Sequence, residues 1–378
     1  MIDPKTKFKL FKQSKNFCAV PWTNFEVYSN GKVETCGRGR TTLGNLHEES
    51  IESILKGEVI TQLRKDMLND IPNKNCVACQ TQSKDDDGYY FLKDHYNSKI
   101  MFEDVDYSDP HNFDLRFIDL HWSNVCNLRC VMCNPDQSSL IAKDENVDVN
   151  LVDPESIKTI TNLILQKQDN IKEIYLSGGE PFYIPQNVTL FSQLENKDIP
   201  IRINTNMHWH KNNKLYKILQ TFNNVQLTMS ADAIHEKFEY IRTGANWKTF
   251  IDNFLYVQEN TDFELRVNMI FSIINAIDVA DNISYWYHGK DIKDLTLNLL
   301  YHPDELVSYN YPADKKQNIV DKLLEVRKTI PEHELNLRSQ INYCVDEILQ
   351  PNKLQYESCL DKITTKSKKP WREVFTDL

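Results

Sequence analysis

The stretch FIDLHWSNVCNLRCVMC, residues 117–133, decides how the rest of the chain is read. Its first part, FIDLHW, is typical of a β-strand, which we place near residues 115–121. Cys126, Cys130 and Cys133 follow on the loop after this strand. Thiolate sulfurs suit iron–sulfur clusters and zinc, and this short spacing lets one loop wrap one face of a cluster. Three thiolates can hold three irons of a 4Fe-4S cube and leave the fourth iron open, whereas a zinc site would need a distant fourth residue.

Beyond this loop, predicted strands alternate with segments of helical spacing. The strands are expected near residues 115–121, 172–177, 200–204, 225–230, 264–273 and 293–300. The helical segments between them include residues 154–168, 213–222 and 246–260. Six such units predict an α/β fold with a parallel sheet and right-handed crossovers, either open or curled into a partial barrel. Functional residues then collect at the C-terminal ends of the strands.

The N-terminal part of the chain has a different pattern. Residues 23–36, TNFEVYSNGKVETC, predict a β-hairpin, with Asn30-Gly31 as a two-residue turn that brings Cys36 back toward Cys18. Helices are expected over residues 48–57 and again before Pro72. We interpret the polar stretches 83–88 and 103–112 as connecting segments, and the second as a domain boundary. Toward the other end, residues 312–349 are predicted to be helical.

Composition excludes several classes of protein. The chain has 378 residues, 40% of them hydrophobic, which is enough for one large or two moderate globular domains. Its net charge of -10 argues against broad nucleic-acid binding, and the basic cluster KSKKPWR near the C-terminus is interpreted as a solvated tail. We expect a cytoplasmic protein without a membrane partner, because no apolar run could span a bilayer and the first residues lack the core of a signal peptide. Nine cysteines in such a protein favour metal ligands or reactive thiols over disulfides.

A second motif, YLSGGEPFY at residues 175–183, lies just after the second predicted strand. Adjacent glycines at a strand end indicate that the backbone approaches something closely, although an ordinary strand-to-helix turn is the alternative. Cys-x3-Cys-x2-Cys after a strand, followed about fifty residues later by Gly-Gly-Glu-Pro, resembles the signature of the radical S-adenosylmethionine (radical SAM) superfamily.

This resemblance implies a cofactor and a set of contacts. The amino and carboxylate groups of SAM would chelate the open iron, and an electron from the cluster would split SAM to give a 5'-deoxyadenosyl radical, which abstracts a hydrogen atom from substrate. The residues that would receive the methionine amino group are Ser177, Gly178, Gly179, Glu180 and Pro181. Met132 stands where the family usually has an aromatic residue against the adenine.

Weaker matches to the family follow later strands. Asn204 and Asn206 end the third strand, and Ser230 and Asp232 end the fourth, where relatives place polar contacts to the SAM ribose and carboxylate. Arg242, in EYIRTGANW, is a candidate for the SAM carboxylate. For these residues a turn former or a surface ion pair is the alternative interpretation.

Four further cysteines lie in the N-terminal part: Cys18, Cys36, Cys76 and Cys79. They could form a zinc ribbon. Their surroundings resemble the SPASM and twitch extensions of radical SAM enzymes, which hold auxiliary 4Fe-4S clusters, here placed before the catalytic domain as in twitch-containing proteins. The resemblance implies two 4Fe-4S clusters in total, and a fully ligated auxiliary cluster suits electron transfer or structural support.

The expected architecture has three parts. Residues 1–100 would form a small α+β domain of SPASM or twitch type, residues 112–305 a partial (β/α)6 TIM-like radical SAM barrel, and residues 306–378 a helical extension. The expected activity is reductive cleavage of SAM and hydrogen abstraction from a peptide or small molecule, with a flavodoxin- or ferredoxin-type electron donor. The alternatives are a carbohydrate or small-metabolite dehydrogenase or epimerase of the same superfamily, and a non-catalytic zinc or iron–sulfur regulatory protein.

Four other residues carry weaker functional hypotheses. His208 and His210 flank Trp209 beyond the third strand, where substrate contact or exposure is favoured over a metal role. Cys344 or Cys359 could donate a hydrogen atom to a substrate radical, but burial in the core is the preferred interpretation.

Overall fold

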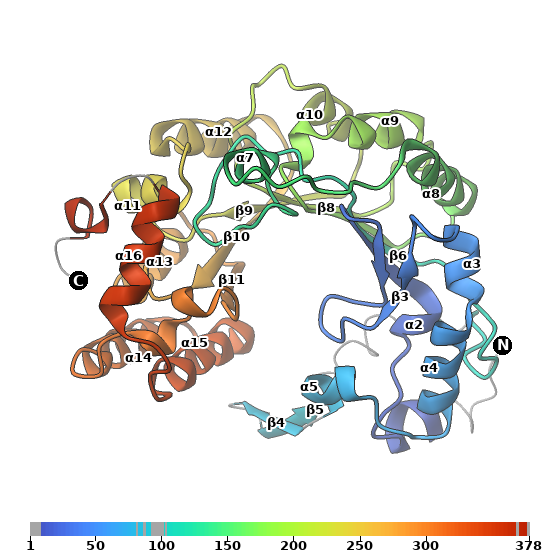
Figure 1. Ribbon diagram of the computed structural model, residues 1–378, viewed down its shortest axis with the longest axis horizontal. Helices are drawn as coiled ribbons and strands as arrows, with labels where there is room; N and C mark the ends of the chain where they lie inside the picture. Colours follow the sequence, from blue (N-terminus) through green and yellow to red (C-terminus); the bar gives the residue numbers. More distant parts are fainter. Residues whose placement is uncertain are drawn as a thin grey trace.

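A curved sheet of nine strands organises the structure (Figure 1). The computed structural model describes residues 9–80, 82–85, 88–91, 102, 104–367 and 370–375. The order of the strands across the sheet is β11-β10-β9-β8-β7-β6-β1-β2-β3, so the two edge strands do not pair and the sheet stays open. The expectation of an α/β fold with a partial rather than a closed barrel is confirmed.

All six strands predicted beyond residue 114 form, and each pairs in parallel with the next along the chain. They are β6 (Phe117–His121), β7 (Glu173–Leu176), β8 (Ile201–Thr205), β9 (Val225–Ser230), β10 (Glu264–Phe271) and β11 (Leu295–Leu299). Helices run between them along the outside of the arc (Figure 1). They are α7 (Ser139–Asp144), α8 (Pro154–Lys167), α9 (Pro185–Gln193), α10 (Lys214–Leu219), α11 (His235–Ile241), α12 (Trp247–Asn260) and α13 (Val279–Ser284).

Local sequence explains where these elements begin and which way they face. At the start of α8, the Asp153 side chain accepts hydrogen bonds from the backbone N–H groups of Glu155 and Ser156, each at 2.9 Å. In β6, Ile118 and Leu120 are each 1% exposed, whereas the alternate residues of the strand are half-buried. One face of the sheet therefore packs against helices, and the other face is more polar and remains free for a site.

The N-terminal strands belong to the same sheet. β1 (Asn24–Tyr28) pairs in parallel with β6, in a register that sets Phe25 opposite Ile118 and Tyr28 opposite His121. β2 (Lys32–Glu34) and β3 (Thr42–Asn45) then extend the sheet in antiparallel fashion. The sequence predicted the β1–β2 hairpin but neither β3 nor the pairing with β6.

The hairpin turn differs from the prediction. It has three residues, 29–31, rather than the two of Asn30-Gly31, and Gly31 closes it with a φ of 79°. The positive φ favours glycine at this position, and a Cβ there would also lie 2.7 Å from Oδ1 of Asn45, so that side chain would have to shift.

Helices and a second small sheet complete the N-terminal part. They are α2 (Val20–Thr23), α3 (Ile51–Lys56), α4 (Glu58–Leu68) and α5 (Val77–Gln80), with β4 (Gln82–Asp85) and β5 (Gly88–Phe91) paired in antiparallel fashion. The interpretation of residues 83–88 as a connecting segment is therefore wrong where β4 and β5 form. Within the second polar stretch, which we interpret as a domain boundary, Tyr107 is fully buried against Phe11, Phe17 and Trp22.

The C-terminal part is helical, as expected for residues 312–349. α14 (Lys316–Thr329) and α15 (Leu335–Ile348) pack together beside β11, and α16 (Tyr356–Ser367) follows them (Figure 1). Short π and 3-10 turns are η1 (Lys9–Gln13), η2 (Lys74–Cys76), η3 (Pro181–Tyr183), η4 (Tyr285–Gly289), η5 (Asp304–Leu306), η6 (Ser308–Asn310) and η7 (Trp371–Glu373). Within the described part of the chain, no helix combines the length and apolar character that crossing a bilayer requires.

The hydrogen bonds of Arg64 on α4 connect three segments of the N-terminal part, and replacing this residue tests how much they stabilise it. Its guanidinium is fully buried and donates to the carbonyl oxygens of Pro21, at 3.0 and 2.8 Å, and of Pro110, at 3.1 Å. Arg64→Ala should lower the free energy of unfolding by about 3 kcal/mol, because it leaves buried carbonyls without donors. Urea unfolding measures the loss, with the exposed neighbour Lys65→Ala as the control. Equal stability of the two variants would show that Arg64 does not carry this junction.

Candidate radical SAM site

The three-cysteine loop leaves β6 at its C-terminal end and is held by the start of α7. The Cys126 N–H donates to Oγ of Ser139 at 3.3 Å, and the Ser138 hydroxyl donates to the Leu128 carbonyl at 2.8 Å. Ser138 is also the N-cap of α7, because its Oγ accepts from the backbone N–H of Ile141. The loop is thus fixed by its own sequence, and Cys130 is buried within it.

Gly178 and Gly179 lie against the backbone of this loop. The Gly179 N–H donates to the Ser123 carbonyl at 3.1 Å, and the Glu180 N–H donates to the Val125 carbonyl at 2.8 Å. A Cβ at Gly179 would lie 2.1 Å from the Val125 carbonyl oxygen, and Gly178 has a φ of 99°. The close approach expected of the glycine pair is therefore an approach to the cysteine loop itself.

The other residues of this motif connect to neighbouring strands. The buried carboxylate of Glu180 accepts from the Thr205 hydroxyl at 2.8 Å and from the Asn206 N–H at 2.7 Å, and burial raises its pKa to about 7. Ser177 Oγ lies 2.5 Å from Nδ1 of His121. Pro181 begins the turn η3. Glu180 thus holds the end of β8 to the loop after β7.

Some of the residues predicted on later strands to contact SAM lie at the same end of the sheet as the cysteine loop. Asn206 follows β8, and its side-chain amide donates to Asn127 in the cysteine loop at 2.9 Å. Asn204 and Ser230 are half-buried on β8 and β9. Met132 is half-buried and packs against the hydrophobic core. Asn206 therefore connects the end of β8 to the cysteine loop.

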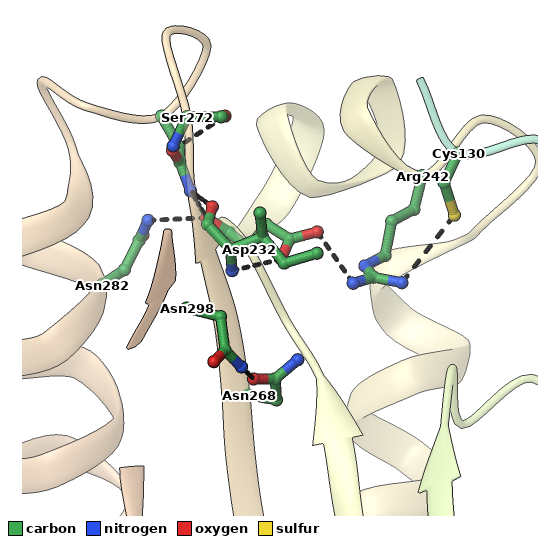
Figure 2. A network of polar contacts seen from close by, with 9 residues as sticks. Cys130, Asp232, Arg242, Asn268, Ser272, Asn282 and Asn298 are labelled. Carbon is green, nitrogen blue, oxygen red and sulfur yellow. Dashed lines mark hydrogen bonds and ion pairs between the residues drawn. The ribbon is translucent and has the colours of Figure 1, made fainter. Parts of the chain in front are cut away.

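Arg242 and Asp232 form a buried ion pair beside Cys130 (Figure 2). Nη2 of Arg242 lies 2.8 Å from Oδ2 of Asp232, and Nη1 donates to Sγ of Cys130 at 3.7 Å. Although burial opposes the charge, Asp232 holds the pKa of Arg242 above its usual range. The Asp232 carboxylate is 1% exposed and already bonded, so the structure places it against Arg242 rather than open to a ribose.

The four N-terminal cysteines gather in one place. The Gly39 N–H donates to Sγ of Cys36 at 3.2 Å, and a Cβ at Gly39 would lie 3.3 Å from Sγ of Cys76. Burial is the main cause of a raised pKa at Cys18, and the nearby thiol of Cys36 is the second. The thiols of Cys76 and Cys79 raise this pKa further. All four thiols therefore lie within mutual electrostatic reach, without disulfides.

The chemistry of both cysteine sets suits a bound cation. Burial raises the pKa of Cys126 and of Cys76 to about 12, so these buried thiols stay protonated unless positive charge stabilises their thiolates.

The residues with weaker hypotheses are placed as follows. Both ring nitrogens of His208 are engaged, Nδ1 with the Asn206 carbonyl at 2.6 Å and Nε2 with the backbone of Asn246. His210 is exposed. Cys344 and Cys359 are 0% and 1% exposed within the core around the C-terminal helices, which agrees with a packing role.

The sequence did not predict a row of acidic residues on the inner face of the sheet. Glu34, Glu26 and Asp119 lie directly opposite one another on the adjacent strands β2, β1 and β6. Lys32 pairs with Glu34 at 2.7 Å, and His121 pairs with Asp119 at 2.7 Å. The Tyr28 hydroxyl donates to Glu26 at 2.9 Å. A charged residue inside the strand FIDLH was the available signal, but its partners depend on a pairing between distant segments.

Gly179→Ala tests the contact between the glycine pair and the cysteine loop. The new methyl would overlap the Val125 carbonyl, so the loop must move or the fold must loosen, at a cost of about 3 kcal/mol or more. We expect a lower melting temperature and faster alkylation of the buried Cys130. Gly289→Ala is the matched control, since the nearest atom to its new Cβ lies 3.9 Å away. If both variants behave alike, the close packing is not required.

Glu26 predicts a pH dependence of stability. Burial, with the charge of Asp119, raises its pKa from an ordinary 4.5 to about 7. The folded state therefore binds the Glu26 proton more tightly than the unfolded state does. The protonated carboxyl contributes to the free energy of unfolding in full below pH 4.5, and this contribution is lost as the pH rises through 7. Glu26→Gln should therefore gain up to about 3 kcal/mol relative to wild type between pH 4.5 and pH 8. Melting at several pH values measures this gain, and the exposed Glu48→Gln should not show it.

Comparison with known proteins places the site in a family. A model of the radical SAM superfamily matches residues 120–272, and a model of the SPASM iron–sulfur cluster-binding domain matches residues 18–80. The chain is 26% identical over 181 residues to the GTP 3',8-cyclase of Listeria welshimeri, which covers 47% of this chain and 51% of that protein. This chain therefore aligns with about half the length of that curated relative.

Solved structures show more distant likeness. Native anSMEcpe with bound AdoMet has a TM-score of 0.43 and 17% identity, covering 59% of this chain and 62% of that chain. SuiB of Streptococcus suis bound to its precursor peptide SuiA has a TM-score of 0.41 and 17% identity, covering 57% and 47%. The two family models, matched in separate parts of the sequence, show a SPASM iron–sulfur cluster-binding domain over residues 18–80 ahead of a radical SAM domain over residues 120–272.

Proposed function

We propose that the chain reductively cleaves SAM and abstracts a hydrogen atom from a peptide or small-molecule substrate. Cys126, Cys130 and Cys133 would hold a 4Fe-4S cluster, and the four N-terminal cysteines a second one. When bound, the first cluster and SAM supply one-electron chemistry that generates a 5'-deoxyadenosyl radical. The second cluster would exchange an electron with the substrate, and a flavodoxin- or ferredoxin-type protein would be the external donor.

One observation carries this proposal: in the part of the chain that the structure describes, three cysteines lie on one hydrogen-bonded loop at the C-terminal end of a parallel sheet, with no fourth cysteine on that loop. The nearest acidic groups are committed elsewhere, since Glu180 accepts from the end of β8 and Asp232 pairs with Arg242. An open iron is what a cluster needs in order to bind a reactant. The incomplete ligand set therefore supports a reacting cluster, and the complete set of four supports an electron-transfer partner.

The chain's own groups would shape the space around the cofactor. The glycine pair fixes the backbone beside the cysteine loop, because no side chain intervenes between the two segments. Asn206 and Asn127 join the end of β8 to the same loop at 2.9 Å. The half-buried polar residues on the inner face of the sheet, Asn204 and Ser230 among them, would face SAM or the substrate. Burial of Cys130 and Arg242 keeps water from that side of the loop.

Release of 5'-deoxyadenosine tests the catalytic assignment. The anaerobically reconstituted chain should release it when given SAM and dithionite, as measured by chromatography and mass spectrometry. Cys126→Ala should abolish release, because one ligand of the cluster is lost, whereas Cys344→Ala, which removes a buried core thiol, should retain it. Equal release by wild type and Cys126→Ala would refute the proposal.

Iron content tests the number of clusters separately. Two 4Fe-4S clusters require about eight irons per chain. The double variant Cys76→Ala/Cys79→Ala and the triple variant with alanine at positions 126, 130 and 133 should each retain about four. A colourless protein that binds zinc instead would favour the non-catalytic alternative.

A further inference from the structure

Backbone pairing sets Arg242 directly opposite Cys130. The Arg129 N–H donates to the Thr243 carbonyl at 2.8 Å, and the Val131 N–H donates to the Ile241 carbonyl at 2.9 Å. The cysteine loop donates both bonds, and its residue numbers rise as those of the acceptors fall, so the two segments run antiparallel and the bonds flank the facing pair. The side chains of directly opposite residues in such a pairing lie on the same side. The contact between Arg242 and Cys130 is therefore built into the backbone of the loop.

The far side of the guanidinium is fixed by the sheet. Figure 2 shows Asp232 between Arg242 and the residues at the end of β10. Oδ1 of Asp232 accepts from the Ile270 N–H at 2.9 Å, and its carbonyl accepts from the side-chain amides of Asn275 at 2.7 Å and Asn282 at 3.2 Å. With its acidic partner anchored in this way, Arg242 has little freedom to turn away from the sulfur.

Burying the ion pair of Arg242 and Asp232 costs free energy of desolvation, which suggests that the pair has a role other than stabilising the fold. The side chain of Arg242 is 9% exposed and that of Asp232 is 1% exposed. A buried ion pair often stabilises a fold no better than apolar residues of the same volume. Moreover, Nε of Arg242 has no hydrogen-bond partner among the described residues, so the pair is not optimised as a structural clamp.

We propose that Arg242 is a positioning residue that donates from Nη1 to Sγ of Cys130 and thereby raises the reduction potential of the cluster on the three-cysteine loop. An N–H group close to a cluster sulfur favours the reduced state, because reduction adds negative charge to the sulfurs. Asp232 offsets part of this effect while it aims the guanidinium. The inference rests on the proposed function, because it requires a cluster on Cys126, Cys130 and Cys133. It gives Arg242 a role that does not need SAM.

Redox titration of the reconstituted full-length chain, followed by electron paramagnetic resonance without SAM, tests this role. The titration is made in the Cys76→Ala/Cys79→Ala background, so that the auxiliary site contributes no signal. Arg242→Gln should shift the potential downward and lower the ratio of reduced to oxidised cluster at a fixed potential three- to tenfold; a tenfold change in this ratio corresponds to about 59 mV for one electron. Asp232→Asn should shift it upward, because the arginine charge is then less compensated.

The opposite signs separate tuning from general damage to the site. Arg129→Gln is the matched control, since it removes an equal charge from the same loop, where Arg129 pairs with Asp144 at 2.8 Å and not with a sulfur. Iron per chain is measured for every variant to establish that the cluster is present. Shifts of the same sign in the two test variants, an equal shift in Arg129→Gln, or no shift in iron-loaded Arg242→Gln would each overturn the inference.

Failure of this inference is distinguishable from failure of the proposed function. If Arg242→Gln weakens SAM binding but leaves the potential unchanged, Arg242 serves the SAM carboxylate and the proposed function stands. If the background chain binds no redox-active iron although its three-cysteine loop is intact, the proposed function itself fails. Should Arg242→Gln not assemble the cluster, Asp232→Asn decides the matter, because an unchanged or lowered potential in that variant contradicts tuning by the arginine.

Discussion

The parallel pairing of β1 with β6 is the constraint on which the arrangement of the two cysteine sets depends. β6 leads directly into the loop with Cys126, and β1 leads through its hairpin to Cys36. Because the two strands run side by side in a fixed register, the N-terminal cluster-binding part is a lateral extension of the radical SAM sheet. A flexible tether would leave the separation of two redox sites variable, whereas a shared hydrogen-bonded sheet fixes it.

A second constraint acts within the site. Backbone contacts at Gly179 and Glu180 join the loop after β7 to the cysteine loop, the Glu180 carboxylate joins both to the end of β8, and Asn206 returns to the cysteine loop. Three consecutive strand ends are thus tied together by groups that need no ligand for their hydrogen bonds. Such a site is organised before its cofactors arrive, which reduces the ordering cost of binding them.

Sequence reasoning succeeded where the signal was local. The six parallel strands, α8, α12 and the helices after residue 312 follow from periodicity, and the cysteine spacings with the glycine pair indicated the family. It failed where the outcome depends on distant segments. Nothing in the sequence TLGN predicts β3, and Asp119 cannot reveal that Glu26 and Glu34 will lie beside it. The ion pair between Asp232 and Arg242 could not be foreseen either, because the two side chains meet only when the end of α11 packs against the cysteine loop.

The position of β1 within the sheet has a consequence for biosynthesis. A ribosome completes β1, β2 and β3 well before it reaches β6, so one side of β1 lacks its neighbour during that interval. A strand with unpaired N–H and C=O groups is a template for pairing with other chains. The nascent N-terminal part is therefore exposed to aggregation until residues 117–121 emerge. Truncations before that point should be handled as chaperone clients rather than as small independent proteins.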